Sequence, residues 1–135
     1  MYTDVQQILV IDSDAERRQR SAGLLADEGF AVTAVAEGFS AVRAASLCRF
    51  AMVVVAVELP GTLDGAATVR HIRAQQPWLR ALFTGDAARR PWCPAAGLDD
   101  FIAAPFHRRD LLGCVFELLQ RHTRQPGQPD RSRAL

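Results

Sequence analysis

One run of seven consecutive apolar residues constrains this fold more than any other feature of the chain. The segment AMVVVAV (51–57) contains no polar side chain and is soon followed by Pro60-Gly61. A continuous apolar run of this length is typical of a central parallel strand that is covered on both faces. In open α/β sheets, binding sites lie where such strands end. The residue four before Pro60 is Ala56, so this strand ends without a reactive side chain.

Shorter apolar segments alternate with helical patterns on both sides of this run. We predict further strands at 8–11, 31–35, 79–83 and 101–104, and helices at about 14–27, 39–48, 64–76 and 109–122. Strands that alternate with helices indicate one parallel sheet between two helical layers. The predicted fold class is therefore α/β, with a doubly wound five-stranded parallel sheet.

The segment TGDAARRPWCPAAG (84–97) interrupts this alternation. Pro91 and Pro94 lie three residues apart, and a proline inside a helix costs about 3 kcal/mol. We therefore expect only a turn or a loop, which leaves the fourth helix short or missing. Trp92 either serves as an exposed apolar anchor for a partner or folds back over the gap left by the short helix.

Composition narrows the classes of function. The 135 residues carry a net charge of +1, which gives no reason to expect binding to nucleic acid or membrane. The first residues, MYTDVQQ, are polar, so we expect no signal peptide there, and no apolar run reaches the length needed to span a bilayer. Three cysteines without C-x-x-C spacing fit a reduced compartment, so we expect a cytoplasmic protein. Neither a phosphate-binding loop nor a nucleophile elbow nor a zinc motif is present, and we expect no enzyme.

Four motifs follow one another in the order known from one family. They are ILVIDSD (8–14), VELPGTLDG (57–65), LFTG (82–85) and AAGLDDFIAAPF (95–106). Through them, residues 6–120 resemble the receiver domain of two-component response regulators, the CheY-like domain. The resemblance implies the flavodoxin-like strand order 2-1-3-4-5. Residues 121–135 are polar and we expect a flexible tail there.

The resemblance also indicates where the family's chemistry would lie. Family members accept a phosphoryl group from a histidine kinase on an aspartate at the end of the third strand. Ala56 stands at that position, and a methyl group offers no nucleophile. The two acids that hold Mg²⁺ in the family correspond to Asp12 and Ser13, and the lysine that pairs with the phosphoryl oxygens corresponds to Ala104.

Three of the five positions that carry the family's chemistry therefore differ, and the lost charges balance one another. We interpret the chain as a pseudo-receiver that binds a protein partner, such as a histidine kinase or another response regulator, without being phosphorylated. Mg²⁺ needs several oxygen ligands in an octahedral arrangement. We therefore expect no tight Mg²⁺ site, with Asp12 and Glu58 as the remaining weak candidates. The alternative is a phosphorelay receiver that is phosphorylated on another acid, such as Asp12 or Asp14.

Thr84 and Phe101 match the coupled switch pair of the family. They are either retained as structure or still switched by some other ligand, since a ligand shifts only an equilibrium that it binds differentially. We expect a cis peptide bond before Pro105. The resemblance places a partner-binding face at Thr84, Trp92, Phe101, Pro105 and Phe106.

Two local predictions concern helices. Ser13 and Glu16 have the spacing of a capping box, so we expect Ser13 to cap the first helix. The last helix carries an apolar stripe that is wider than one core-facing side requires, namely Leu111, Leu112, Val115, Phe116, Leu118 and Leu119. This stripe either supports a homodimer, which we favour slightly, or covers a wide part of the sheet.

Overall fold

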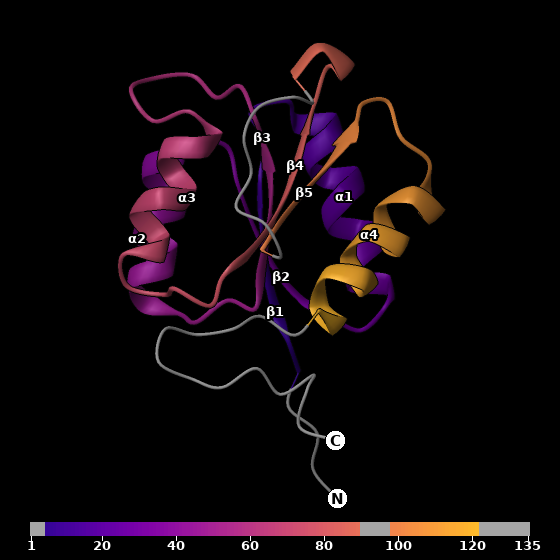
Figure 1. Cartoon of the computed structure of the whole chain (residues 1–135), viewed down its shortest axis with the longest axis horizontal. Helices are drawn as coiled ribbons and strands as arrows, with labels where there is room; N and C mark the ends of the chain where they lie inside the picture. The colour runs from indigo at the N-terminus through magenta and orange to yellow at the C-terminus, as the bar shows by residue number, and fades with distance from the viewer. Residues whose placement is uncertain (1–4, 90–97, 122–135) are drawn as a thin grey trace, which may run out of the picture.

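The computed structural model describes residues 5–89 and 98–121 and contains one five-stranded sheet (Figure 1). Its elements are β1 (Gln7–Ile11), α1 (Ala15–Asp27), β2 (Ala31–Val35), α2 (Gly38–Leu47), β3 (Met52–Ala56), α3 (Gly65–Arg73), β4 (Arg80–Gly85), β5 (Asp99–Ala103) and α4 (Arg108–Gln120). The strand order is β2-β1-β3-β4-β5, and all four pairings are parallel. The predicted α/β class and the order 2-1-3-4-5 are confirmed.

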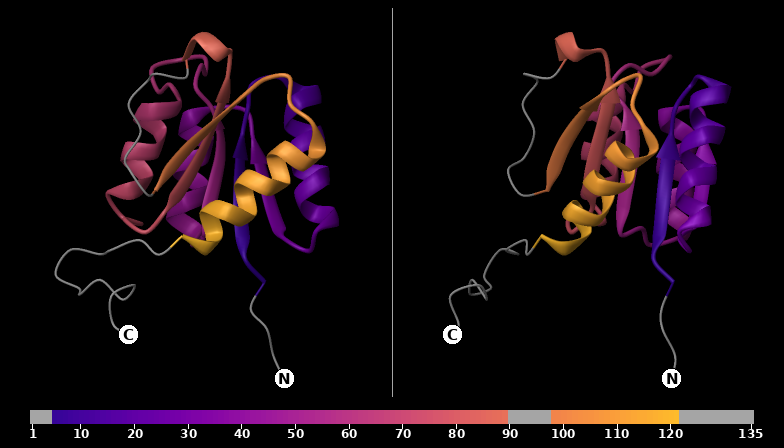
Figure 2. Two further views of the ribbon diagram at one scale, coloured as in Figure 1. Left: turned by 45° about the vertical axis from the view of Figure 1, so that its right-hand side comes forward. Right: turned by 90° about the vertical axis from the view of Figure 1, so that its right-hand side faces the viewer.

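Helices cover both faces of the sheet. In Figures 1 and 2, α2 and α3 lie on one face, and α1 and α4 lie on the other. Successive residues of β3 point to opposite faces, so Val53 and Val55 belong to the core beneath α2 and α3. Met52 and Val54 belong to the core beneath α1 and α4. Every residue of β3 is buried, as its unbroken apolar pattern predicted.

Turns and caps fix the loops that follow the carboxyl ends of the strands. Gly61, in the loop that follows β3, has φ +87°, a conformation that glycine adopts without strain. Asp64 caps α3 by accepting a hydrogen bond from Ala67 N at 2.8 Å. The Ala104-Pro105 peptide bond is cis, which confirms the expectation for this position.

The connection from β4 to β5 carries little helix within the described residues. A single 3₁₀ turn, Ala87–Arg89, follows β4. Pro91, Trp92 and Pro94 lie outside the described residues, so the expected role of Trp92 stays a prediction. Residues 122–135, most of the expected tail, also lie outside them.

The prediction that Ser13 caps the first helix is wrong. The N-cap is Asp14, whose Oδ1 accepts a hydrogen bond from Arg17 N at 2.9 Å, and Ser13 is exposed. The reason lies two residues upstream, where Asp12 Oδ1 accepts a hydrogen bond from Asp14 N at 2.9 Å. This contact holds Asp14 in the extended conformation of a capping residue, so α1 begins one residue later than expected.

Most of the apolar stripe on α4 packs inside the molecule. Leu111, Leu112, Val115 and Leu118 are buried in the core beneath α1 and α4. Leu119 packs partly against that core, whereas Phe116 is 40 % exposed and its ring lies 5.8 Å from that of Phe30. The stripe thus covers the sheet, and a homodimer stays a prediction. None of the helices in 5–89 and 98–121 has the length and hydropathy needed to cross a bilayer.

Candidate functional site

A pocket of about 330 Å³ lies at the carboxyl ends of β3 and β4. Its lining residues come from four parts of the chain and are Arg17, Ala56, Val57, Glu58, Thr84, Gly85, Asp86 and Ala104. Parallel pairing sets Ala56 at the end of β3 directly beside Thr84 of β4. Ala104 follows β5 and donates a hydrogen bond from its N to Gly85 O at 2.7 Å. The sheet therefore brings together Ala56, Thr84, Ala104 and Glu58, four positions that the family resemblance had singled out.

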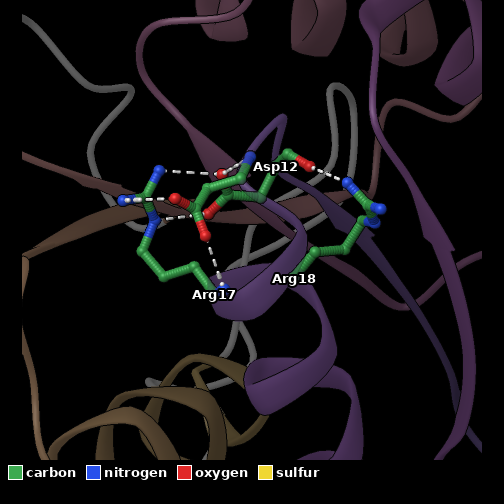
Figure 3. Close-up of polar contacts among 4 residues, drawn as sticks. Asp12, Arg17 and Arg18 are labelled. Atoms are coloured by element: carbon green, nitrogen blue, oxygen red, sulfur yellow. Dashed lines mark hydrogen bonds and ion pairs between the residues drawn. The ribbon is translucent and has the colours of Figure 1, made fainter.

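Asp12 follows β1, and its carboxylate is held by an arginine of α1 (Figure 3). Arg17 Nε donates to Asp12 Oδ2 at 2.8 Å, and Arg17 Nη2 donates to Asp12 Oδ1 at 2.9 Å. Asp12 is 6 % exposed, and Arg17 rather than Asp12 lines the pocket. Two parallel N–H···O bonds between a guanidinium and a carboxylate form the strongest kind of side-chain ion pair.

Further hydrogen bonds fix the short connection between β1 and α1. Asp12 Oδ1 also accepts from Asp14 N, and the backbone oxygen of Asp12 accepts from Arg18 Nη1 at 2.9 Å. Asp12 N donates to Val35 O at 3.1 Å and thereby extends the pairing of β1 with β2. The carboxylate and the carbonyl of Asp12 are thus both occupied by groups of this chain.

Two pKa shifts follow from these contacts. The hydrogen bond to Asp12 raises the pKa of the Arg17 guanidinium above its ordinary value, against the opposing effect of burial. The hydrogen bond from Arg17 N lowers the pKa of the Asp14 carboxyl, and the charges of Arg17 and Arg18 add to this effect. Both shifts favour the charged forms of Arg17 and Asp14.

The buried part of the pocket lining contains few reactive side chains. Ala56 and Ala104 contribute methyl groups, and Thr84, which is 5 % exposed, contributes a hydroxyl-bearing side chain. The two acids of the lining, Glu58 and Asp86, are exposed. Across the described ranges, no group of three or more histidine, cysteine, aspartate or glutamate residues is arranged to hold a metal ion.

Sequence reasoning missed Arg17 and Asp86. Asp86 directly follows β4, and its position at a strand end was a usable signal. Arg17 is the third residue of α1, one turn from Asp12. Its approach to Asp12 depends on side-chain direction, which the residue pattern does not report.

The expected partner-binding face divides into two parts. Phe101, Pro105 and Phe106 line a second, more open groove of about 520 Å³ between β5 and α4. Pro105 is exposed, whereas Phe106 is buried and Phe101 packs partly against the core beneath α2 and α3. Thr84 belongs to the first pocket instead, and Trp92 lies outside the described residues.

The strand order, together with a pocket at the carboxyl ends of β3 and β4, defines the class of CheY-like α/β domains. Comparison with known families takes this further. The chain belongs to the response regulator receiver domain family, whose model matches residues 8–116.

Individual relatives agree with this assignment. The chain is 30 % identical over 121 residues to the transcriptional regulatory protein ResD of Bacillus subtilis, a match that covers 88 % of this chain and 50 % of ResD. It is 29 % identical over 130 residues to the DNA-binding response regulator MtrA of Mycobacterium tuberculosis, covering 95 % of this chain and 57 % of MtrA. The chain thus spans about half the length of these curated relatives.

One similar solved structure is a receiver domain with an occupied metal site. The chain resembles the receiver domain of the sensor histidine kinase PA1611 from Pseudomonas aeruginosa, with a TM-score of 0.74 and 30 % identity over 86 % of this chain and 98 % of that one. That structure holds a magnesium ion coordinated in its active site cleft.

Proposed function

We propose that this receiver domain serves two-component signalling as a protein-interaction module that works without being phosphorylated itself. The observation that carries the proposal is the methyl group of Ala56. This residue ends β3, is 6 % exposed and lines the pocket at the mouth of the sheet. Phosphoryl transfer to a side chain requires an oxygen or nitrogen nucleophile, which alanine lacks.

The donor set also argues against a magnesium site. Mg²⁺ takes octahedral oxygen ligands at about 2.0–2.1 Å and gives up its waters reluctantly. Asp12 is the one buried acid at the end of β1, and both of its carboxylate oxygens accept hydrogen bonds from Arg17. Ser13 is exposed and Ala56 offers a methyl group, so these residues do not fit the ion.

Phosphorylation of another acid is the competing function. Its candidates, Asp12 and Asp14, are both engaged in hydrogen bonds. Asp12 holds Arg17 and the backbone of Asp14, while Asp14 caps α1 through Arg17 N. An attack on phosphorus from either carboxylate would break contacts that fix the start of α1. These contacts favour the first proposal.

The partner we propose is a histidine kinase or another response regulator. On this proposal the domain binds neither nucleic acid nor membrane and catalyses no reaction. Membership of the response regulator receiver domain family and the similarity to the DNA-binding response regulator MtrA support this choice. The groove between β5 and α4 offers Phe101 and Pro105 as contact residues. Aromatic side chains at such grooves are frequent anchors of protein interfaces.

Intact mass measurement tests the proposal. The purified chain is incubated with acetyl phosphate and MgCl₂, and separately with a phosphorylated histidine kinase, next to a phosphoacceptor receiver domain as a positive control. We expect no phosphoryl mass on this chain while the control is modified. A phosphoryl adduct that Asp12→Asn or Asp14→Asn removes would establish the competing function instead. Binding to a purified kinase or receiver partner is expected to be the same with and without acetyl phosphate.

A further inference from the structure

We infer that the guanidinium of Arg17 acts as a built-in cation that takes the place of a divalent metal ion on Asp12. On this view, Arg17 itself excludes metal from the site, in addition to the loss of metal ligands at neighbouring positions. The inference deepens the proposed function and rests on it, because it assumes a site that no longer handles phosphoryl groups.

The first argument is charge compensation. Asp12 is buried, with 6 % of the residue exposed, and burying an uncompensated charge is costly. The chain contains no lysine, so an arginine is the only permanently charged side chain that can balance it. Arg17 does so with two contacts, at 2.8 and 2.9 Å, that engage both carboxylate oxygens.

The second argument is competition for the same oxygen atoms. A metal ion bound to Asp12 would have to remove at least one of the two guanidinium contacts. It would also meet the positive charge of Arg17, which lines the pocket, and that of Arg18, which donates to the carbonyl oxygen of Asp12. Like charges at such short range repel strongly where water is partly excluded.

The third argument is that Arg17 is tethered. It lies in the first turn of α1, and its own backbone N is bonded to the cap residue Asp14. Its guanidinium also lies 3.9 Å from Asp14 Oδ2. A tethered group competes for the carboxylate oxygens at a high effective concentration, which does not depend on the concentration of protein or salt in solution. The guanidinium therefore has a lasting advantage over an ion that must bind from solution.

Ser13→Asp and Arg17→Gln, made singly and together, separate the two causes of metal exclusion. Ser13 is exposed and does not cap α1, so an aspartate there adds an acid next to Asp12 without loss of a contact that the structure describes. Mn²⁺ binding is measured through the electron paramagnetic resonance signal of the unbound ion, and circular dichroism checks that each variant is folded.

We expect Ser13→Asp with Arg17 intact to bind Mn²⁺ weakly, and Ser13→Asp/Arg17→Gln to bind it at least about tenfold more tightly, a gain of about 1.4 kcal/mol. Ser13→Asp/Arg70→Gln is the matched control, because Arg70 is exposed on α3 and its loss changes the net charge equally. That control is expected to bind Mn²⁺ as weakly as Ser13→Asp.

Equal Mn²⁺ affinity of Ser13→Asp and Ser13→Asp/Arg17→Gln would overturn the inference, because ligand loss alone would then explain the exclusion. A second measurement uses the unaltered protein and does not depend on the folding of a variant. The ¹H–¹⁵N signal of Arg17 Nε is expected to be protected from exchange and unchanged by MgCl₂. Its shift or loss on addition of MgCl₂, beyond that seen with NaCl of equal ionic strength, would also overturn the inference.

These outcomes are distinct from a failure of the proposed function. The Mn²⁺ and Arg17 Nε measurements report on cation binding and require no phosphoryl transfer. Conversely, a phosphoryl adduct on the unaltered chain would refute the proposed function and leave the comparison of metal affinities intact.

Discussion

Gly65, the first residue of α3, lies directly against the carbonyl oxygen of Ala56 at the end of β3. A Cβ atom at position 65 would stand 2.3 Å from that oxygen, which is closer than any real contact of this kind. Gly65 N meanwhile donates a hydrogen bond to Val57 O at 3.0 Å. Helix α3 can therefore approach the mouth of the sheet this closely only because residue 65 has no side chain.

Gly65→Ala is expected to lower the free energy of unfolding by about 1–3 kcal/mol, the usual cost of forcing an extra methyl group into a packed region. Urea denaturation measures this change. Gly23→Ala is the matched control, because Gly23 lies on the exposed side of α1 with no atom within 4 Å of its Cβ position. That control is expected to gain up to about 1 kcal/mol from helix propensity. Equal effects at the two positions would contradict the close approach.

Ala56→Asp restores an oxygen nucleophile at the end of β3 but restores neither a cation nor a lysine at Ala104. We expect no phosphoryl mass after incubation with acetyl phosphate and MgCl₂. We also expect the free energy of unfolding to fall by about 1–3 kcal/mol, because a charged group enters a buried position. Ala56→Asn, which has the same shape without the charge, is the control for stability. Phosphorylation of Ala56→Asp would show that the missing acceptor is the only defect of the site.

The cap of α1 is expected to make stability depend on pH in the acidic range. The pKa of Asp14 is lowered in the folded protein, first through the hydrogen bond from Arg17 N. A lowered pKa stabilises the fold above the ordinary carboxyl pKa of ~3.9, and this contribution is lost as the pH falls through the folded pKa.

The thermal midpoints of the unaltered protein and Asp14→Asn, measured side by side, test this dependence. Asparagine also caps helices but does not titrate. We expect the difference between the two thermal midpoints to be constant above about pH 5. As the pH falls below ~4, the midpoint of the unaltered protein should fall relative to that of Asp14→Asn. A difference that moves the other way on acidification would contradict the assignment of Asp14 as the cap.

Cys114 on α4 is expected to react slowly with alkylating agents. Its thiol pKa is raised, mainly by burial and further by the negative charges of Asp100, Glu117 and Asp110. Because the thiolate is the reactive form, fewer molecules are reactive at a given pH. The rate of reaction with iodoacetamide, measured against pH in a Cys48→Ser/Cys93→Ser variant, should therefore reach its midpoint above the ordinary thiol value of ~8.5.

The same variant in denaturing urea provides the reference rate for Cys114. A midpoint at or below the value found in urea would contradict the burial of this thiol.

The fold was predictable from the sequence because it depends on patterns that the chain repeats. The unbroken apolar run of β3 indicated a strand covered on both faces, and alternation with helices left few ways to connect the sheet. The grouping of Ala56, Thr84 and Ala104 at one mouth came from the resemblance to receiver domains, and the pocket lining contains all three.

The part of the site that escaped prediction depends on side-chain direction and on a shift of one residue. Ser13 and Asp14 are both good capping residues, and the sequence pattern favoured Ser13. The choice was made by the contact between Asp12 and the backbone of Asp14, which is a tertiary feature of the loop. The contact between Arg17 and Asp12 depends on how the arginine side chain folds back over the start of α1, and no pattern of residue types reports such a contact.

The pairing of Asp12 with Arg17 has a consequence for how this domain can respond to the cell. A bound metal ion that exchanges with solution makes a site sensitive to the magnesium concentration and to chelators. The guanidinium of Arg17, by contrast, is part of the polypeptide and is present in every folded molecule. If Arg17 excludes metal from Asp12 as we propose, the mouth of this sheet keeps one electrostatic state in magnesium-poor and magnesium-rich conditions alike. Regulation would then act through the amount of protein made and through the partners available to it.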